Sequence, residues 1–191
     1  MTKKKIFAAV AIIVLAAGIY KIYDVYFNYR FMEISDNKVY KSGVIPPDEI
    51  ADFVKKYNIK SIIDLRGPIT VDTINNPEKP QEIVAEKNAV EQIPNVNYFN
   101  IPSRQVPSKE TLNKFYKVMD NKENYPVLIH CYHGIGRAQV YSALYRIEYE
   151  GFSNEDARKN AAFPVLFSSF DNGTPKGEFL KGYVKRKDSV K

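Results

Sequence analysis

The chain has 191 residues, of which 45% are hydrophobic and 26% charged, a globular composition that excludes a largely disordered chain. Its net charge of +6 and pI of about 9.2 favour anionic partners, such as phosphorylated molecules or acidic lipid surfaces. The basic residues are scattered and no nucleic-acid motif is present, so we expect no nucleic-acid partner. A single cysteine excludes an internal disulfide and a cysteine-based zinc site.

The chain begins with a membrane-directed pattern, because lysines at 3–5 precede an unbroken apolar run over residues 6–20. One interpretation is an uncleaved membrane anchor over residues 1–22, with Lys21 and the following tyrosines at the membrane interface. Another is a signal peptide cleaved after small residues at 16–18. A buried helix of a soluble domain is the third. In the first two the lysines stay in the cytoplasm, so we expect the domain on the exported, periplasmic or extracellular side, either tethered or secreted.

The rest of the chain divides into a juxtamembrane connector at 23–32 and one domain at 33–191. We predict a hairpin of strands at 33–35 and 39–42, then strands at 61–65, 96–101 and 126–130. We predict helices at 46–57, 81–89, 108–119, 138–149, 154–161 and 175–185, with an exposed loop at 68–80. Strands that alternate with helices indicate an α/β architecture.

The only cysteine and the only two histidines lie in one segment, at His130, Cys131 and His133. A predicted buried strand enters this segment, and a helix is predicted to leave it near Arg137. Backbone N–H groups in such a turn can surround one anion and stabilise a thiolate at Cys131. The pattern predicts in-line attack of Cys131 on phosphorus and a cysteinyl-phosphate intermediate, with His130 fixing the loop or favouring the thiolate. The predicted phosphate-binding residues are Tyr132, His133, Gly134, Ile135, Gly136 and Arg137.

Residues 130–137 resemble the HCxxGxxR signature of cysteine-dependent protein tyrosine and dual-specificity phosphatases. Residues 39–43 and 62–66 resemble early segments of the compact bacterial and atypical dual-specificity members, so the resemblance covers about residues 33–185. It implies a central mixed sheet of four to five strands flanked by helices. It also implies hydrolysis of phosphate monoesters in phosphotyrosine or phosphoserine proteins or in inositol phosphates, with no metal and no cofactor.

Two positions depart from this family pattern. Ala138 follows the arginine, where the family usually has a Ser or Thr whose hydroxyl steadies the departing thiolate. Residues 99–107 hold no carboxylate, although the family usually places an aspartic general acid there. General acid catalysis typically contributes about 10²–10⁴-fold, so this difference bears directly on activity.

Three explanations remain open at this point. The acid comes from His133 or from Asp72, or the substrate is a phosphoanhydride that needs little protonation, or the domain binds phosphate and turns over poorly. A sulfur-transfer protein of the rhodanese type is a more distant alternative. Arg104 and Lys41 are candidate substrate contacts that would favour several phosphates on one molecule.

Overall fold

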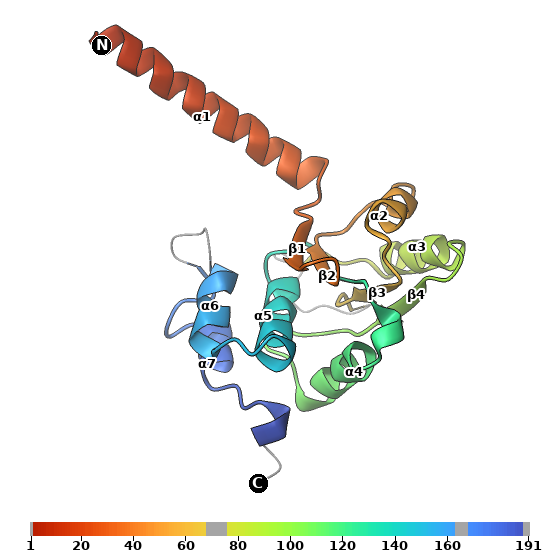
Figure 1. Ribbon diagram of the computed structural model, residues 1–191. Helices are drawn as coiled ribbons and strands as arrows, with labels where there is room; N and C mark the ends of the chain where they lie inside the picture. The colour runs from red at the N-terminus through yellow and green to blue at the C-terminus, as the bar shows by residue number, and fades with distance from the viewer. Residues whose placement is uncertain (1, 68–75, 163–167, 189–191) are drawn as a thin grey trace.

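The structure is a computed structural model that describes residues 2–67, 76–162 and 168–188 (Figure 1). Five short strands occur in these ranges: β1 (Met32–Ser35), β2 (Val39–Ser42), β3 (Ser61–Asp64), β4 (Asn97–Asn100) and β5 (Val127–His130). The helices are α1 (Lys3–Tyr26), α2 (Ile50–Tyr57), α3 (Pro80–Glu91), α4 (Lys109–Met119), α5 (Arg137–Tyr149), α6 (Asn154–Ala162) and α7 (Pro175–Lys181), with short 3₁₀ turns η1 (Lys122–Asn124) and η2 (Arg186–Asp188).

The strands form one mixed sheet in the order β1-β2-β5-β3-β4, which confirms the predicted fold class. Only β1 runs antiparallel to its neighbour. The four parallel strands end in register, so that Ser42, His130, Asp64 and Asn100 lie side by side across the sheet. Open α/β sheets usually carry their ligand sites at this carboxyl edge.

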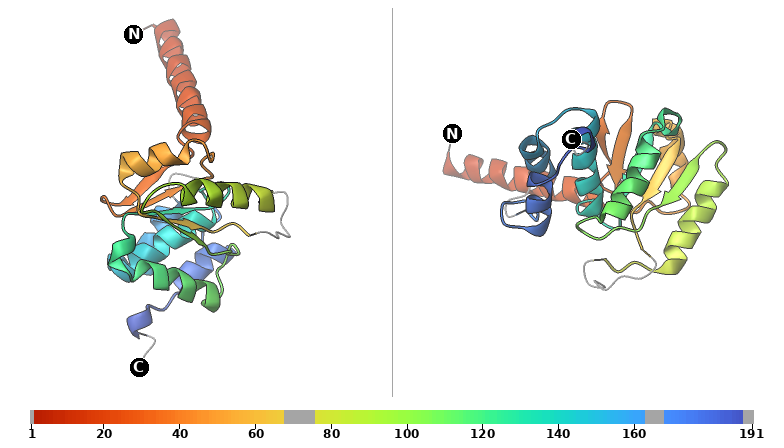
Figure 2. Two further views of the ribbon diagram at one scale, coloured as in Figure 1. Left: turned by 90° about the vertical axis from the view of Figure 1, so that its right-hand side faces the viewer. Right: turned by 90° about the horizontal axis from the view of Figure 1, so that it is seen from below.

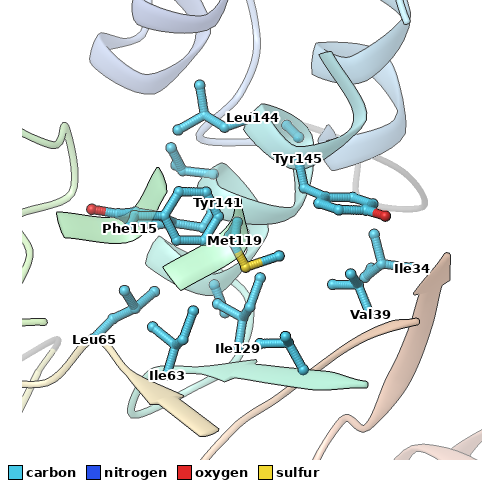
Figure 3. Packing of buried hydrophobic residues seen from close by; sticks show 14 of the residues in the cluster. Ile34, Val39, Ile63, Leu65, Phe115, Met119, Ile129, Tyr141, Leu144 and Tyr145 are labelled. Carbon is cyan, nitrogen blue, oxygen red and sulfur yellow. The ribbon is translucent and has the colours of Figure 1, made fainter. Parts of the chain in front are cut away.

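Helices cover both faces of the sheet (Figure 2). On one face α2 and α3 pack against β5 and β3, with Val54 and Leu128 in the same apolar cluster. On the other face α4, α5 and the last helices enclose a larger cluster, in which Tyr141 packs above Ile129 (Figure 3). Strands β3 and β5 are buried on both faces, which explains why their sequences are nearly continuous apolar runs.

Two predicted helix boundaries need correction. Helix α2 begins at Ile50 rather than at 46, because the Pro46 carbonyl accepts hydrogen bonds from the N–H groups of Glu49 and Ile50 in a preceding turn. The last helix ends at Lys181, next to Gly182, and residues 186–188 form the separate turn η2.

Helix α1 projects away from the domain and has no buried residue (Figure 1). The helix has 24 residues, and the mean hydropathy of its most apolar window is 2.2. It is long and apolar enough to cross a membrane, although a signal sequence has the same properties. At 1.5 Å per residue the helix measures about 36 Å, against about 30 Å for the hydrocarbon core of a bilayer. The helix continues to Tyr26 and so includes the first four residues of the predicted connector.

Candidate active site

The loop between β5 and α5 holds Cys131 at the carboxyl edge of the sheet. The Cys131 side chain is buried, and the Gly134 N–H donates to its Sγ over 3.3 Å. Helix α5 begins at Arg137, directly after the loop, so its amino terminus lies beside the thiol. A helix amino terminus and an N–H donor both stabilise negative charge on sulfur.

Three consecutive carbonyl groups of this loop accept hydrogen bonds from residues outside it. The Tyr132 carbonyl accepts from the Val44 N–H at 3.1 Å, and the His133 carbonyl accepts from Arg30 Nη1 at 2.8 Å. The Gly134 carbonyl accepts from Lys41 Nζ at 3.1 Å. In a trans peptide the following N–H points away from the carbonyl, so the N–H groups of residues 133–135 point into the loop. The outer donors thereby build an inner anion cradle.

Gly134 is required by this arrangement. Its φ of +72° lies in the left-handed region, and a Cβ atom there would lie 2.4 Å from the Gly43 backbone nitrogen. No other residue fits that space without moving β2 or the loop.

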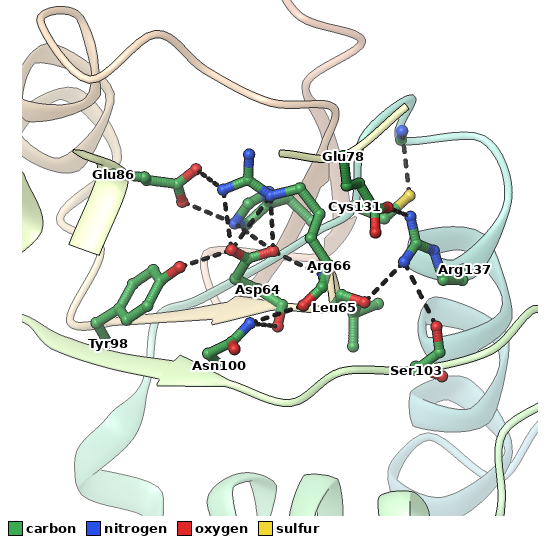
Figure 4. A network of polar contacts seen from close by, with 12 residues as sticks. Asp64, Leu65, Arg66, Glu78, Glu86, Tyr98, Asn100, Ser103, Cys131 and Arg137 are labelled. Atoms are coloured by element: carbon green, nitrogen blue, oxygen red, sulfur yellow. Dashed lines mark hydrogen bonds and ion pairs between the residues drawn. The ribbon is translucent and has the colours of Figure 1, made fainter. Parts of the chain in front are cut away.

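The guanidinium of Arg137 is held on two sides within the site (Figure 4). Its Nη2 pairs with the Glu78 carboxylate and donates to Asn76 Oδ1 at 3.0 Å, while Nη1 donates to the Leu65 carbonyl at 2.9 Å. The other Glu78 oxygen accepts from the Gly67 N–H at 3.1 Å. Arg137 therefore lies in a fixed orientation next to Cys131.

A cavity of about 590 Å³ opens over the loop and brings together Cys131, His133 and Arg137. Five residues that the sequence reasoning did not select also line it, among them Arg30 from the segment after α1, Gln105 from the loop after β4, and Lys176 from α7. Lys176 Nζ donates to Gln105 Oε1 at 3.2 Å. Burial lowers the pKa of Lys176, although the nearby Cys131 acts to raise it.

Of the other predicted site residues, Ile135 and Gly136 also line this cavity, whereas Lys41 and Arg104 do not. Lys41 is buried beneath the loop, where it supports the Gly134 carbonyl instead of facing a substrate. Arg104 is exposed, and its neighbour Gln105 faces the cavity in its place. Ile135 lies at the cavity lining, 55% exposed, and the Tyr132 ring packs edge-on against His133. Asp72 lies outside the described residues.

A buried charge cluster lies behind the loop (Figure 4). Asp64 accepts from Arg66 Nε and Nη2 and from the Tyr98 hydroxyl, and Arg66 Nη2 also contacts Glu86 at 2.5 Å. His130 Nε2 lies 2.8 Å from Glu86 Oε1. His130, which the sequence predicts to fix the loop, is a member of this cluster. Its contacts tie the residue before Cys131 to β3 and α3.

Burial and charge act in opposite directions on the members of this cluster. Burial alone lowers the pKa of His130, but Glu86 and Asp64 outweigh it and raise that pKa above its ordinary value. Burial alone raises the pKa of Asp64, but His130 and Arg66 lower it below its ordinary range. Both shifts therefore favour the charged forms of these groups.

The same cluster has the residue types of a metal site, since Asp64, Glu86 and His130 place one ligand atom each within 4.8 Å of one another. Arg66 already pairs with both carboxylates, at 2.9 Å and 2.5 Å. The negative charge that would attract a cation is thus matched by Arg66 and His130, and the donor set fits a structural charge network better than a metal centre.

Sequence reasoning missed Glu78, Gln105, Arg30 and Lys176 for a common reason. Each lies in a loop, in the connector or at a helix start, and only the tertiary fold brings it to Cys131. Gln105 had a partial signal, because it lies in the segment where the family places its acid. Ala138 is buried at the start of α5 and carries no hydroxyl toward the thiol, as its sequence dictates.

A family model described as DSP-PTPase phosphatase fused to NAD⁺ kinase matches residues 21–167. The chain belongs to this phosphatase family. The match confirms the resemblance to cysteine-dependent dual-specificity phosphatases, and it covers the sheet, the loop at Cys131 and helix α5.

Solved structures support the same fold. The catalytic domain of the PP-IP phosphatase SIW14 from S. cerevisiae is 20% identical with a TM-score of 0.60, over 83% of this chain and 88% of that one. TpbA from P. aeruginosa is 15% identical with a TM-score of 0.59, over 82% and 86%. Tk-PTP is 18% identical with a TM-score of 0.58, over 79% and 91%. A search of curated proteins finds no match.

Proposed function

We propose that this member of the phosphatase family is a cysteine-dependent phosphoric monoester hydrolase with Cys131 as nucleophile. The observation that carries the proposal is the Gly134 N–H contact to Cys131 Sγ inside a loop whose N–H groups point inward. Arg137 lies in the same cavity and offers a planar donor group suited to two phosphate oxygens.

In this mechanism the loop N–H groups and Arg137 bind the equatorial phosphate oxygens. The Cys131 thiolate attacks phosphorus in line, an S–P bond forms, and the bond to the leaving oxygen breaks. Water then hydrolyses the cysteinyl phosphate and regenerates the thiolate. His130 acts as a positioning residue, because its contacts run to Glu86 and Asp64 behind the loop and not into the cavity.

The source of the proton for the leaving group distinguishes the open accounts. Gln105, an amide that cannot supply a proton as an acid, occupies the loop after β4. Glu78 is engaged by Arg137 and Gly67. Among the described residues that line the cavity, His133 is the acid candidate that the sequence predicts, and Asp72, which lies outside the described residues, is the alternative.

The substrates we propose are phosphotyrosine or phosphoserine proteins or inositol phosphates, with phosphoanhydrides as the class that needs no acid. Two of the structurally similar proteins support these substrate classes. A TpbA variant was crystallised with pTyr, and SIW14 is a PP-IP phosphatase. We further propose that α1 anchors the domain on the exported side of a membrane, with secretion after signal cleavage as the alternative.

Turnover of p-nitrophenyl phosphate by a chain starting near residue 23 tests the activity, with Cys131→Ser as the control. We expect wild-type turnover between pH 5 and 7 and none in the variant. Equal rates for both proteins would leave the second candidate, a phosphate-binding module with poor turnover, which Ala138 and Gln105 favour.

A further inference from the structure

The connector between α1 and the sheet is folded. The Arg30 N–H donates to the Asp24 carbonyl at 2.7 Å, and the Phe31 N–H donates to the Asn28 carbonyl at 2.8 Å. The Asn28 side chain donates to Asp24 Oδ1 at 3.3 Å. These bonds join the last turn of α1 to the start of β1 through one compact turn, so the helix is not attached by a loose tether.

This turn is also fixed to the domain. Phe31 stacks on Tyr57 with ring centroids 4.2 Å apart, and the Tyr29 hydroxyl donates to Glu49 at 2.7 Å. The Gly43 N–H, at the end of β2, donates to the Tyr29 carbonyl at 2.7 Å. Aromatic packing of this kind adds to the stabilisation from the area it buries, so the connector moves with the sheet.

Arg30 connects the turn to the cavity. It lines the cavity and donates through Nη1 to the His133 carbonyl, which uses one of the five donors of its guanidinium. Arg30 lies four positions after Tyr26, where α1 ends, so their Cα atoms lie at most about 14 Å apart. With α1 in a bilayer, the cavity is held at a height that a lipid headgroup can reach.

The described residues that line the cavity include no carboxylic acid, which favours a leaving group that departs without a proton. Gln105 stands where this family usually places a carboxylic acid, and Glu78 is committed to Arg137. Where neither His133 nor Asp72 supplies the proton, an alcohol leaves poorly, whereas a phosphate group leaves as an anion that Arg30 and Lys176 can neutralise. Arg30 lies on the side of the cavity that is joined to the membrane helix.

We propose that the cavity removes the terminal phosphate of lipids with a diphosphate headgroup, at the surface of the membrane that holds α1; this rests on the proposed phosphatase mechanism. Cys131 Sγ attacks the terminal phosphorus, the S–P bond forms, and the bridging P–O bond breaks with its electron pair going to the leaving lipid monophosphate. Water then cleaves the S–P bond, so that inorganic phosphate and the thiolate are released. Arg30 contacts the phosphate that stays on the lipid.

The test uses the full chain in phosphatidylcholine nanodiscs with four substrates. These are a polyprenyl diphosphate, the matching polyprenyl monophosphate, soluble inorganic pyrophosphate and a phosphotyrosine peptide, with p-nitrophenyl phosphate as the check on folding and mechanism. We expect kcat/KM for the lipid diphosphate to exceed that for the lipid monophosphate by about 10²-fold or more, the range a missing general acid predicts. It should exceed that for pyrophosphate at least roughly tenfold, because the lipid is concentrated at the surface.

A matched variant isolates the membrane geometry. A Gly-Ser linker of about twelve residues between Tyr20 and Lys21 leaves the connector contacts intact and separates the cavity from the bilayer by up to roughly 40 Å. We expect it to lower kcat/KM for the lipid diphosphate about tenfold and to leave pyrophosphate and p-nitrophenyl phosphate unchanged. Arg30→Lys should lower the lipid diphosphate rate more than the p-nitrophenyl phosphate rate.

The outcomes separate the inference from the function on which it rests. Equal rates on the lipid monophosphate would overturn the anhydride preference. Equal rates on pyrophosphate, or no effect of the linker, would overturn the membrane geometry. Preference for the peptide would overturn the lipid substrate while the phosphatase mechanism stands. No turnover of any substrate, p-nitrophenyl phosphate included, would remove the phosphatase mechanism and the inference together.

Discussion

Glu78 pairs with the guanidinium of Arg137, and both side chains are almost completely buried. The carboxylate comes from the segment before α3, whereas the arginine opens α5. The proposed phosphate ligand is thus fixed before a phosphate binds. Preorganisation of this kind is what electrostatic catalysis requires.

Glu78→Gln tests this positioning role. It leaves a buried guanidinium without its counter-charge, so we expect the free energy of unfolding to fall by roughly 3 kcal/mol. We expect kcat/KM for p-nitrophenyl phosphate to fall at least about tenfold, since a misplaced ligand loses transition-state contacts. Urea unfolding and steady-state kinetics measure the two effects.

The matched control is Glu82→Gln in α3, whose carboxylate lies 3.8 Å from Lys79 in an exposed ion pair. Exposed pairs contribute at most about 1 kcal/mol, so this variant should keep both stability and activity. Equal behaviour of the two variants would show that Glu78 has no special role.

The sequence was sufficient for the fold because strands β3 and β5 carry continuous apolar runs and because Ser108 caps α4 through the Thr111 N–H. It also placed Cys131 and Arg137 in one loop, and the structure brings both to the same cavity, while their roles in catalysis stay a prediction. Lys41 was assigned wrongly to the cavity, because side-chain alternation along β2 does not reveal that its ammonium reaches back under the loop to Gly134.

The surrounding residues could not be predicted because they meet only through the topology. Glu86 lies in a helix whose pattern does not mark it as buried, and it becomes an ion partner because His130 and Arg66 converge on it from β5 and from the end of β3. Arg30 lies in the connector, where no periodic pattern exists, and only the folded structure identifies it, through its place in the cavity lining and its bond to the His133 carbonyl.

Ala138→Ser restores a hydroxyl after the arginine. If hydrolysis of the cysteinyl phosphate is slow in the wild type, p-nitrophenyl phosphate should give a pre-steady-state burst. One good donor to a developing charge is worth about 1.4 kcal/mol, so kcat should rise about tenfold in the variant while kcat/KM stays constant. Stopped-flow measurement of the burst checks this, and an unchanged kcat would place the slow step elsewhere.

The pH dependence of stability should reveal the charge cluster. The folded-state pKa of His130 is raised above its ordinary 6.5 against the effect of burial, by Glu86 and then Asp64. The contribution of protonated His130 to the stability of the fold is therefore complete below pH 6.5, and it is lost as the pH rises through the folded-state pKa. Asp64 has a lowered pKa, so its contribution is present above its ordinary 3.8 and is lost as the pH falls through its folded-state value.

His130→Asn removes the group that makes stability fall toward alkaline pH, which we call the basic limb of the stability profile. We expect the difference in unfolding free energy between wild type and variant to be largest below pH 6.5 and to shrink toward alkaline pH in urea titrations. His133→Asn, which changes the histidine outside the cluster, is the control and should leave this limb in place. A His130→Asn difference that is constant with pH would refute the assignment.

Lys41 should set an alkaline limb of activity. Burial lowers its pKa to about 8, against the opposing influence of Cys131, so its charge beneath the loop is lost as the pH rises through 8. We expect kcat/KM to fall there, because the loop then loses the positive charge that lies beneath it and acts on the Cys131 thiolate. Lys41→Arg, with folding checked by thermal melting, should move this limb to higher pH, and an identical profile in the variant would exclude Lys41 as its source.

The most direct test of the central claim is intact-protein mass spectrometry after rapid acid quench during p-nitrophenyl phosphate turnover. The proposed mechanism predicts one added phosphoryl group, located on Cys131 by fragmentation and absent from Cys131→Ser. Because Ala138 provides no hydroxyl for the second step, this species should accumulate. Turnover without any phosphoryl group on Cys131, or with the group on another residue, would contradict the account.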